Sequence, residues 1–275
     1  MNAKMDELMD MLQNGVDEYF RSDKYKLLLN TMARFHTYSY GNCILIGQQM
    51  PNATYIAGYS AWKQNFHRQV KKHERSIRII SPTKYKTVDD DGIEIEHLGF
   101  KSAAVFDISQ TEPIPDTDPV PIGVPELVGD IENFTGLISA CHAVSPVRIE
   151  FDHVIGGAKG YFSDAEQKIV INLGMSQKHT AHTILHEICH AKIHSHVAMK
   201  EEKKDRHTIE TEAESVSYIC SKYFGFDTSL YSFPYILSYT EAGHEAMLRS
   251  SMTVIQKTAD EIIKGIEEEL FKTAS

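Results

Sequence analysis

Four histidines recur at intervals of four residues within positions 180–194: His182, His186, His190 and His194. Residues four apart lie on one face of an α-helix, so this spacing predicts a helix that points a row of imidazoles to one side. The middle pair encloses Glu187 in the pattern H-E-x-x-H. Two neutral imidazoles can hold a Zn²⁺ ion while the adjacent carboxylate takes the proton of a bound water, so the pattern indicates a hydrolytic zinc site.

A chance occurrence of this pattern is the alternative explanation, because the chain contains 14 histidines. Any neighbouring pair of the four histidines has the spacing to bind a metal. Only His186 and His190 have a glutamate directly after their first member, so we predict these two as metal ligands and Glu187 as general base. We expect His182 and His194 to be hydrogen-bonded neighbours or exposed residues.

A third protein ligand would complete such a site, and residues 208–224, which have the pattern of a helix, offer three glutamates. Glu210 and Glu214 are four residues apart and share a face. Glu212 points about 200° away from Glu210 at 3.6 residues per turn. We therefore predict Glu210 as the third ligand and Glu214 as the acceptor of a hydrogen bond from a ligand imidazole. Glu212 remains the competing third ligand, and a solvated helix face is the alternative explanation for the pair.

A proline-rich segment divides the chain. Residues 111–125 contain five of its nine prolines. Proline lacks the backbone donor, so this segment cannot be a helix interior or a central strand, and an extended linker is expected. A length of 275 residues is enough for two separate cores. We predict an α+β protein with domains at residues 1–112 and 124–275, joined by a linker at residues 113–123.

Apolar spacing and β-branched runs predict the elements of each domain. The N-terminal domain is expected to contain helices at residues 3–20, 24–35 and 38–49, and a small antiparallel sheet from residues 54–57, 76–80, 93–96 and 103–108. The C-terminal domain is expected to contain helices at residues 126–140 and 248–270, a strand at residues 147–151 and a hairpin at residues 160–172. We expect residues 169–172 to form an edge strand that holds an extended peptide. Ser176 is the predicted N-cap of the histidine helix. His207 and Tyr218 are candidates for stabilising an oxyanion.

Positive charge is concentrated in one stretch of an otherwise acidic chain. Residues 63–86 carry eight Lys or Arg against one acid, Glu74, whereas the whole chain has a net charge of −10. Cations that follow phosphates, combined with rings that stack on bases, suit single-stranded DNA; a solvated basic face with core aromatics is the alternative. The aromatic residues in and around this stretch are Tyr55, Tyr59, Trp62, Phe66 and Tyr85. The predicted DNA-binding residues are Trp62, Lys63, Arg68, Lys71, Lys72, Arg75 and Arg78.

The four cysteines have no spacing typical of a disulfide framework, which favours a reducing compartment. No apolar run approaches the length of a membrane span, and the N-terminus has no apolar signal segment. We therefore expect a cytoplasmic protein with no membrane partner.

Several short motifs follow one another along nearly the whole chain. They lie at residues 38–42, 59–63, 70–74, 105–111, 160–163, 186–190, 210–214 and 234–239. With these motifs in this order, the chain resembles the ArdC-type antirestriction proteins of conjugative plasmids and integrative elements. Those proteins join an N-terminal single-stranded-DNA-binding domain to a C-terminal zinc-metallopeptidase domain. The C-terminal part is also similar to the ImmA/IrrE proteases.

The resemblance implies a zincin-like C-terminal fold whose H-E-x-x-H helix helps to bind Zn²⁺. Glu210 matches the family's third zinc ligand, and Glu214 matches the Glu of its A-E pair. The implied function is that of a mobile-element protein that binds single-stranded DNA and hydrolyses a protein substrate. The alternatives are a DNA-coating protein with a structural or vestigial zinc site, and an ImmA-like regulator that cleaves a repressor. Ala191-Lys192 departs from the aromatic residue that often follows H-E-x-x-H in the family, which alters one wall of the cleft more than the metal.

Overall fold

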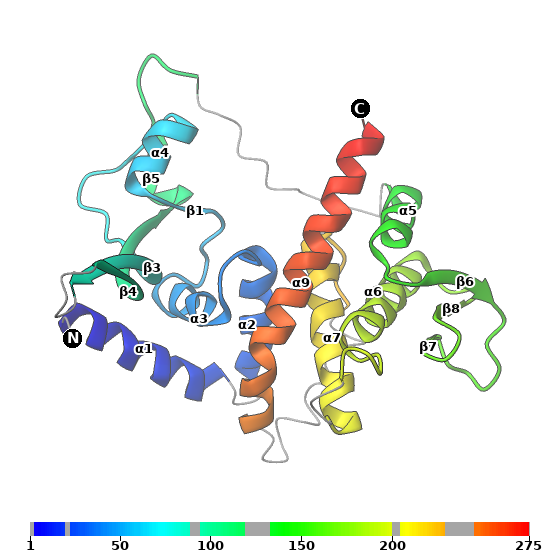
Figure 1. The fold of residues 1–275 in the computed structure, drawn as a ribbon. Helices are drawn as coiled ribbons and strands as arrows, with labels where there is room; N and C mark the ends of the chain where they lie inside the picture. The colour runs from blue at the N-terminus through cyan, green and yellow to red at the C-terminus, as the bar shows by residue number, and fades with distance from the viewer. Residues whose placement is uncertain are drawn as a thin grey trace. The chain divides into compact units, whose positions relative to one another are not determined.

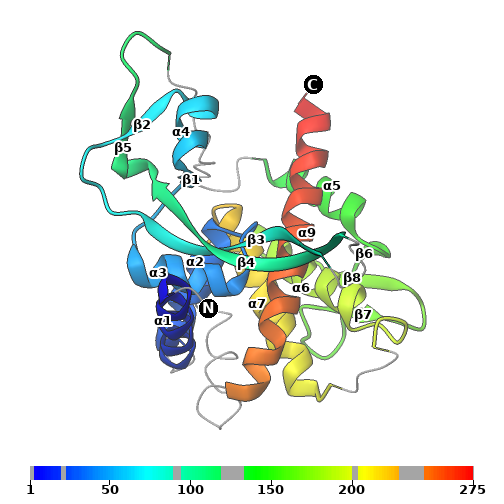
Figure 2. The ribbon, with the colours of Figure 1, turned by 60° about the vertical axis from the view of Figure 1, so that its left-hand side comes forward.

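A computed structural model of the chain describes residues 3–19, 23–88, 94–118, 133–199, 204–228 and 245–274 (Figures 1 and 2). The chain combines helices with small sheets, as expected for the α+β class. It divides into two compact units. The first comprises Met1–Tyr19 and Gly41–Gly123, and the second comprises Phe20–Tyr40 and Val124–Ser275.

In this grouping α2 (Asp23–Arg34) belongs to the second unit, whereas the predicted domain at residues 1–112 included it. Tyr25 of α2 is fully buried, and its hydroxyl lies 3.2 Å from Ser215 Oγ of α7 (Arg206–Tyr223). The Tyr218 hydroxyl of α7 donates a 2.8 Å hydrogen bond to Asn30 Oδ1 of α2. The apolar spacing of α2 predicts a helix but does not specify which core covers its apolar face.

The first unit is built around a three-stranded antiparallel sheet of order β1-β4-β3. Its elements are α1 (Ala3–Tyr19), α3 (Tyr40–Gln49), β1 (Ile56–Gly58), β3 (Ile77–Val88) and β4 (Glu94–Asp107). The short strand predicted at residues 76–80 overlaps β3, and the two predicted at 93–96 and 103–108 both overlap the single long strand β4. β3 and β4 pair from Ile77↔Val105 to Val88↔Glu94. Amide side chains of α3 bond to the outer edge of β3, Asn42 to the backbone of Ile80 and Gln49 to that of Arg78.

A second, smaller part of this unit surrounds Trp62. It comprises α4 (Tyr59–Phe66) and a two-stranded antiparallel pair, β2 (Arg68–Val70) with β5 (Thr111–Pro113). Trp62 is fully buried beside the rings of Tyr55 and Phe66, and its indole N–H donates a 2.9 Å hydrogen bond to the carbonyl of Phe106. Pro113 ends the short strand β5, and residues 119–123 of the predicted linker lie outside the described residues.

Replacing Trp62 with alanine should destabilise the protein by about 3–5 kcal/mol, because the change leaves a large cavity and an unpaired carbonyl. Urea unfolding followed by circular dichroism measures the loss. Tyr59→Ala is the matched control on the same helix: this ring is 61% exposed, so its loss should cost about 1 kcal/mol or less. Equal effects of the two changes would contradict the burial of Trp62.

The second unit packs helices against a three-stranded sheet of order β6-β8-β7. Its remaining elements are α5 (Phe134–Val144), β6 (Arg148–Asp152), β7 (Gly160–Ser163), β8 (Lys168–Asn172), α6 (Gln177–Ile193) and α9 (Glu245–Ala274). The predicted hairpin at residues 160–172 is confirmed as the antiparallel pair β7–β8. The prediction that residues 169–172 form an edge is wrong, because β8 pairs with β6 on its other side and Ile169, Val170 and Ile171 are buried.

Helix α7 occupies the centre of the second unit, between α2, α6 and α9 (Figure 1). Every residue from Thr211 to Ser221 is buried. The side chain of Ser176 caps α6 by accepting a hydrogen bond from the backbone N–H of His179, as predicted. Most of the apolar residues spaced along the last helix are also buried, namely Met252, Ile255, Ala259, Ile262, Ile263 and Ile266, whereas Leu270 is half-buried. The predicted helix at residues 126–140 overlaps α5, and its first part lies outside the described residues.

All four cysteines are buried and free. Among the helices in the described ranges, none combines the length and the apolar character needed to cross a membrane.

Candidate metal centre

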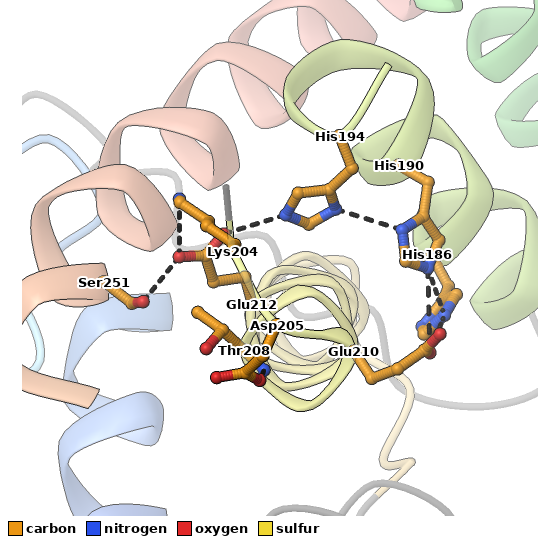
Figure 3. Close-up of polar contacts among 9 residues, drawn as sticks. All are labelled: His186, His190, His194, Lys204, Asp205, Thr208, Glu210, Glu212 and Ser251. Atoms are coloured by element: carbon orange, nitrogen blue, oxygen red, sulfur yellow. Dashed lines mark hydrogen bonds and ion pairs between the residues drawn. The ribbon is translucent and has the colours of Figure 1, made fainter. Parts of the chain in front are cut away.

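Helices α6 and α7 bring together the three side chains predicted as metal ligands (Figure 3). The Nε2 atoms of His186 and His190, one turn apart on α6, lie 3.0 Å from each other. Glu210 reaches them from α7, with its Oε2 atom 3.5 Å from His186 Nε2 and 3.7 Å from His190 Nε2. Two nitrogens and one oxygen therefore face a common point.

The spacing of these atoms suits a small divalent ion. Bonds of about 2.0–2.2 Å to zinc place the ligand atoms of a tetrahedral site roughly 3.3–3.6 Å from one another. The observed separations of 3.0, 3.5 and 3.7 Å bracket that range. Both Nδ1 atoms are engaged elsewhere, so each imidazole presents Nε2 to the centre. The residues present fit a bound metal ion.

Glu214 contacts His186, the first predicted ligand. Its Oε2 atom lies 3.1 Å from His186 Nδ1, where the prediction placed a hydrogen bond, and its Oε1 atom lies 3.1 Å from His182 Nε2. The other nitrogen of His182 lies 2.8 Å from the hydroxyl oxygen of Ser217. His182 is thus a buried, hydrogen-bonded neighbour of the centre. Among the described residues, the group of side chains that could hold a metal ion consists of His186, His190 and Glu210 and does not include His182.

The electrostatics of the centre favour a cation. Burial lowers the pKa of His186, but hydrogen bonds to Glu210 and Glu214 outweigh burial and raise that pKa to about 10. Hydrogen bonds to His186 and His190 hold the pKa of Glu210 well below its usual range. Burial raises the pKa of Glu214, but its hydrogen bonds to His182 and His186 outweigh burial and hold that pKa far below the usual range. A metal ion would replace the proton that these carboxylates otherwise attract.

Glu187 lies beside the two predicted histidine ligands on α6, with its side chain largely buried. Burial raises its pKa, while the charges of His186 and His190 act in the opposite direction. The backbone N–H of Phe162 in β7 donates a hydrogen bond to the carboxylate. A carboxylate with a raised pKa at such a position has the properties of a general base.

A cavity of about 740 Å³ opens next to these residues. One wall is β7, an outer strand of the described sheet, and another is the first turn of α7. A Cβ on Gly160 would meet Thr183 Cγ2 at 2.8 Å and the Val170 carbonyl at 3.0 Å, so glycine allows β7 to approach α6 closely. The cavity is lined by Ala158, Gly160, Tyr161, Phe162, His186, Glu187, His190, His194, Arg206, His207, Ile209 and Glu210.

The remaining predictions for this centre have mixed outcomes. The competing prediction of Glu212 as a ligand is wrong, because its side chain is fully buried and bonds to His194 and Lys204. Of the two candidate oxyanion stabilisers, His207 lines the cavity, whereas the Tyr218 hydroxyl bonds to Asn30. The cavity residues Tyr161, Phe162 and Arg206 were not predicted. The hairpin pattern located β7 in the sequence but did not indicate that it borders the metal centre.

The predicted DNA-binding residues all lie in the first unit. The prediction is wrong for one of them, Trp62. Trp62 is fully buried, so its ring cannot stack on a base. Lys63, Lys72 and Arg75 are exposed. The Lys71 ammonium group donates to the carbonyl of Ser109. Two further arginines are partly buried: Arg68, which donates to Thr111, and Arg78. The large exposed aromatic residues of this unit are Tyr59, Tyr85 and Phe100.

Comparison with known proteins supports the resemblance found in the sequence. Residues 2–108 match the family model of the N-terminal domain of anti-restriction factor ArdC. The structure is similar to that of the metal-free antirestriction protein ArdC from plasmid R388, with a TM-score of 0.52 and 17% identity over 84% of this chain and 86% of that one. The Mn(II)-bound structure of the same protein has a TM-score of 0.54 and 14% identity over 94% of this chain and 98% of that one.

A curated relative comes from Bacillus anthracis, the uncharacterized protein pXO2-81. It is 26% identical over 311 residues, an alignment that includes 96% of this chain and 51% of the relative. The chain therefore spans about half the length of that relative.

Proposed function

We propose that this chain is an antirestriction protein of the ArdC type, because residues 2–108 match the N-terminal domain of anti-restriction factor ArdC and the fold is similar to that of the R388 protein. In this proposal the second unit is a metal-dependent peptidase and the first unit binds single-stranded DNA. The observation that carries the peptidase proposal is the convergence of His186, His190 and Glu210 beside the buried carboxylate of Glu187. All four side chains line one cavity whose wall includes the outer strand β7. The H-E-x-x-H helix in this setting supports a zincin-like fold.

Zn²⁺ is the ion that we propose for the centre. Two imidazoles and one carboxylate are a common ligand set for catalytic zinc, which keeps a further position open. The Mn(II) in the R388 ArdC structure supports a divalent ion in proteins of this type. When bound, such an ion acts as a Lewis acid and lowers the pKa of water to about 7.

The chain's own residues would supply proton transfer and orientation. Glu187 would take a proton from the attacking water and pass it to the leaving amine. The backbone N–H of Phe162 holds the Glu187 carboxylate beside the cavity. Glu214 accepts the Nδ1 proton of His186, which leaves the Nε2 lone pair of that imidazole for the metal.

Strand β7, rather than β8, is the edge that we propose for substrate binding. β8 pairs on both sides, whereas β7 is an outer strand of the described sheet and borders the cavity through Gly160, Tyr161 and Phe162. An extended peptide can pair with the outer edge of such a strand, which suits a protein substrate in an extended conformation.

The DNA-binding proposal rests on the exposed cations of the first unit and on its match to the ArdC N-terminal domain. The exposed aromatic residues of this unit are Tyr59, Tyr85 and Phe100, which are 61%, 52% and 63% exposed. One face of the Tyr85 ring stacks on His97, which leaves its other face for a base. We propose these three rings, in place of the buried Trp62, as the side chains that stack on bases. Base stacking and phosphate contacts together suit a single strand.

Changing Lys63, Lys72 and Arg75 together to alanine should weaken single-strand binding and reduce its salt dependence. Each lost phosphate contact lowers the slope of log K against log salt by about 0.7, so three lost contacts lower it by about 2. Fluorescence anisotropy of a labelled oligothymidine at several salt concentrations measures both quantities. The control variant changes three exposed lysines of the second unit, Lys222, Lys264 and Lys272, to alanine. It therefore lowers the net charge by the same amount as the test variant. An unchanged slope in the first variant would reduce the basic stretch to a solvated surface.

A further inference from the structure

A buried charged cluster lies behind the metal centre, around Glu212 (Figure 3). The Glu212 side chain has no solvent exposure, and its carboxylate has partners from three other parts of the second unit. His194 at the end of α6 lies 2.8 Å away through Nε2. The Lys204 ammonium group donates to both oxygens at 2.8 and 3.0 Å, and the Ser251 hydroxyl of α9 donates to Oε1.

This cluster connects directly to a metal ligand. His194 Nδ1 lies 3.0 Å from His190 Nδ1, on the side of His190 that faces away from Glu210. The contacts therefore form a continuous row from Glu212 through His194 to His190, and Figure 3 shows the three side chains in that order.

Only one placement of protons lets His190 bind a metal and satisfies the whole row. A metal at Nε2 of His190 requires the proton of that ring on Nδ1, where it is donated to His194 Nδ1. His194 must then carry its own proton on Nε2 and donate it to Glu212, which accepts as a carboxylate. Lys204 and Ser251 provide the remaining donors, so the buried charge of Glu212 does not lack partners.

We propose that Glu212 and His194 are positioning residues that fix the tautomer and ring orientation of His190, as Glu214 does for His186. This inference rests on the proposed metal centre. Each ligand imidazole then has its own buried carboxylate, Glu214 directly for His186 and Glu212 through His194 for His190.

The cluster also fixes the start of α7. Lys204 immediately precedes the N-cap Asp205, whose side chain accepts a 2.8 Å hydrogen bond from the backbone N–H of Thr208. Glu210 lies in the next turn of the same helix. The contacts that orient His190 therefore also hold the helix end that supplies the third ligand.

A purely structural role for the cluster makes a different prediction. The buried pair of Glu212 and Lys204 would then stabilise the helix packing, and its loss would lower stability without changing metal affinity in the folded fraction. Metal affinity therefore separates the two explanations. Loss of an outer partner of a ligand typically costs about 10–100-fold in metal affinity.

The experiment measures Zn²⁺ affinity by competition with a chelating dye and records the visible spectrum of the Co²⁺-loaded protein. His194→Ala should bind Zn²⁺ about 10–100-fold more weakly and shift the Co²⁺ bands. His194→Gln should recover most of the affinity, because its amide can accept from His190 and donate to Glu212. Tyr223→Phe, which removes a hydrogen bond to Glu267 elsewhere in the unit, is the control and should leave affinity unchanged.

Circular dichroism establishes the folded fraction of each variant. If His194→Ala does not fold, the nearly isosteric Glu212→Gln decides the question by the same two measurements. A folded variant with wild-type Zn²⁺ affinity and an unshifted Co²⁺ spectrum overturns the positioning role while leaving the metal centre intact. Failure of the wild type to bind Zn²⁺, or wild-type affinity in Glu210→Ala, overturns the proposed metal centre itself.

Discussion

Replacing Glu187 with glutamine is expected to lower peptide hydrolysis by about 10²–10⁴-fold, the usual contribution of a general acid–base residue, while metal content stays at the wild-type level. Glutamine has nearly the same shape, and its carbonyl can still accept the hydrogen bond from Phe162. Burial disfavours the charged carboxylate at this position, so a neutral amide should not reduce stability. The change thus removes the base and leaves the ligand set in place.

New protein N-termini in cells that express wild type or Glu187→Gln provide the measurement, with single-stranded DNA present and with total zinc determined for each purified protein. Glu261→Gln is the matched control, because that side chain is exposed on α9 and lies outside the cavity lining. Cleavage that persists in Glu187→Gln at the wild-type rate would remove this residue from the mechanism.

The same variant separates the proposed peptidase from a protein that protects DNA only by coating it. A restriction-protection assay with Glu187→Gln should show lost protection if proteolysis is needed for antirestriction. Retained protection would assign the function to the first unit and leave the metal centre a structural or vestigial role. Both results depend on the carboxylate of Glu187, which lies in the second unit and outside the proposed DNA-binding surface.

Part of the grouping of His186, His190 and Glu210 could be predicted from the sequence because helical geometry is local. A four-residue interval places His186 over His190, and the angle between Glu210 and Glu212 already separated a residue facing the centre from one facing the core. The structure places Glu210 near both imidazoles and buries Glu212 completely. The spacing did not show that Glu212 would reach His190 through His194, because this contact depends on how closely α6 and α7 pack.

Other features required knowledge of long-range packing. The pattern of α2 is equally compatible with either unit, and only contacts such as Tyr25 with Ser215 assign it to the second. Trp62 stands among lysines in the sequence yet is fully buried. The hairpin pattern predicted two strands but not which of them pairs with β6. In each case the deciding partner lies far away in the chain.

Loss of the metal is the expected result of replacing Glu210 with alanine. Glu210 is one of only three predicted protein ligands, so its removal should cost more than the roughly 10–100-fold that follows loss of an outer partner. Its side chain is 40% exposed, so stability in the absence of metal should change little. Zinc analysis after gel filtration measures the metal content of wild type and Glu210→Ala, and competition with a chelating dye measures the zinc affinity of each.

Two companion variants make the Glu210 result specific. Glu210→Asp keeps a carboxylate but withdraws it by one methylene, so an intermediate affinity is expected. Glu166→Ala removes an exposed glutamate in the turn between β7 and β8 and should leave zinc binding unchanged. Stoichiometric, wild-type zinc binding in Glu210→Ala would exclude this residue as a ligand. Because Glu212 is buried on the opposite side of α7 with Lys204 and Ser251, it could replace Glu210 only if α7 rotated, and the Co²⁺ spectrum would then differ from that of the wild type.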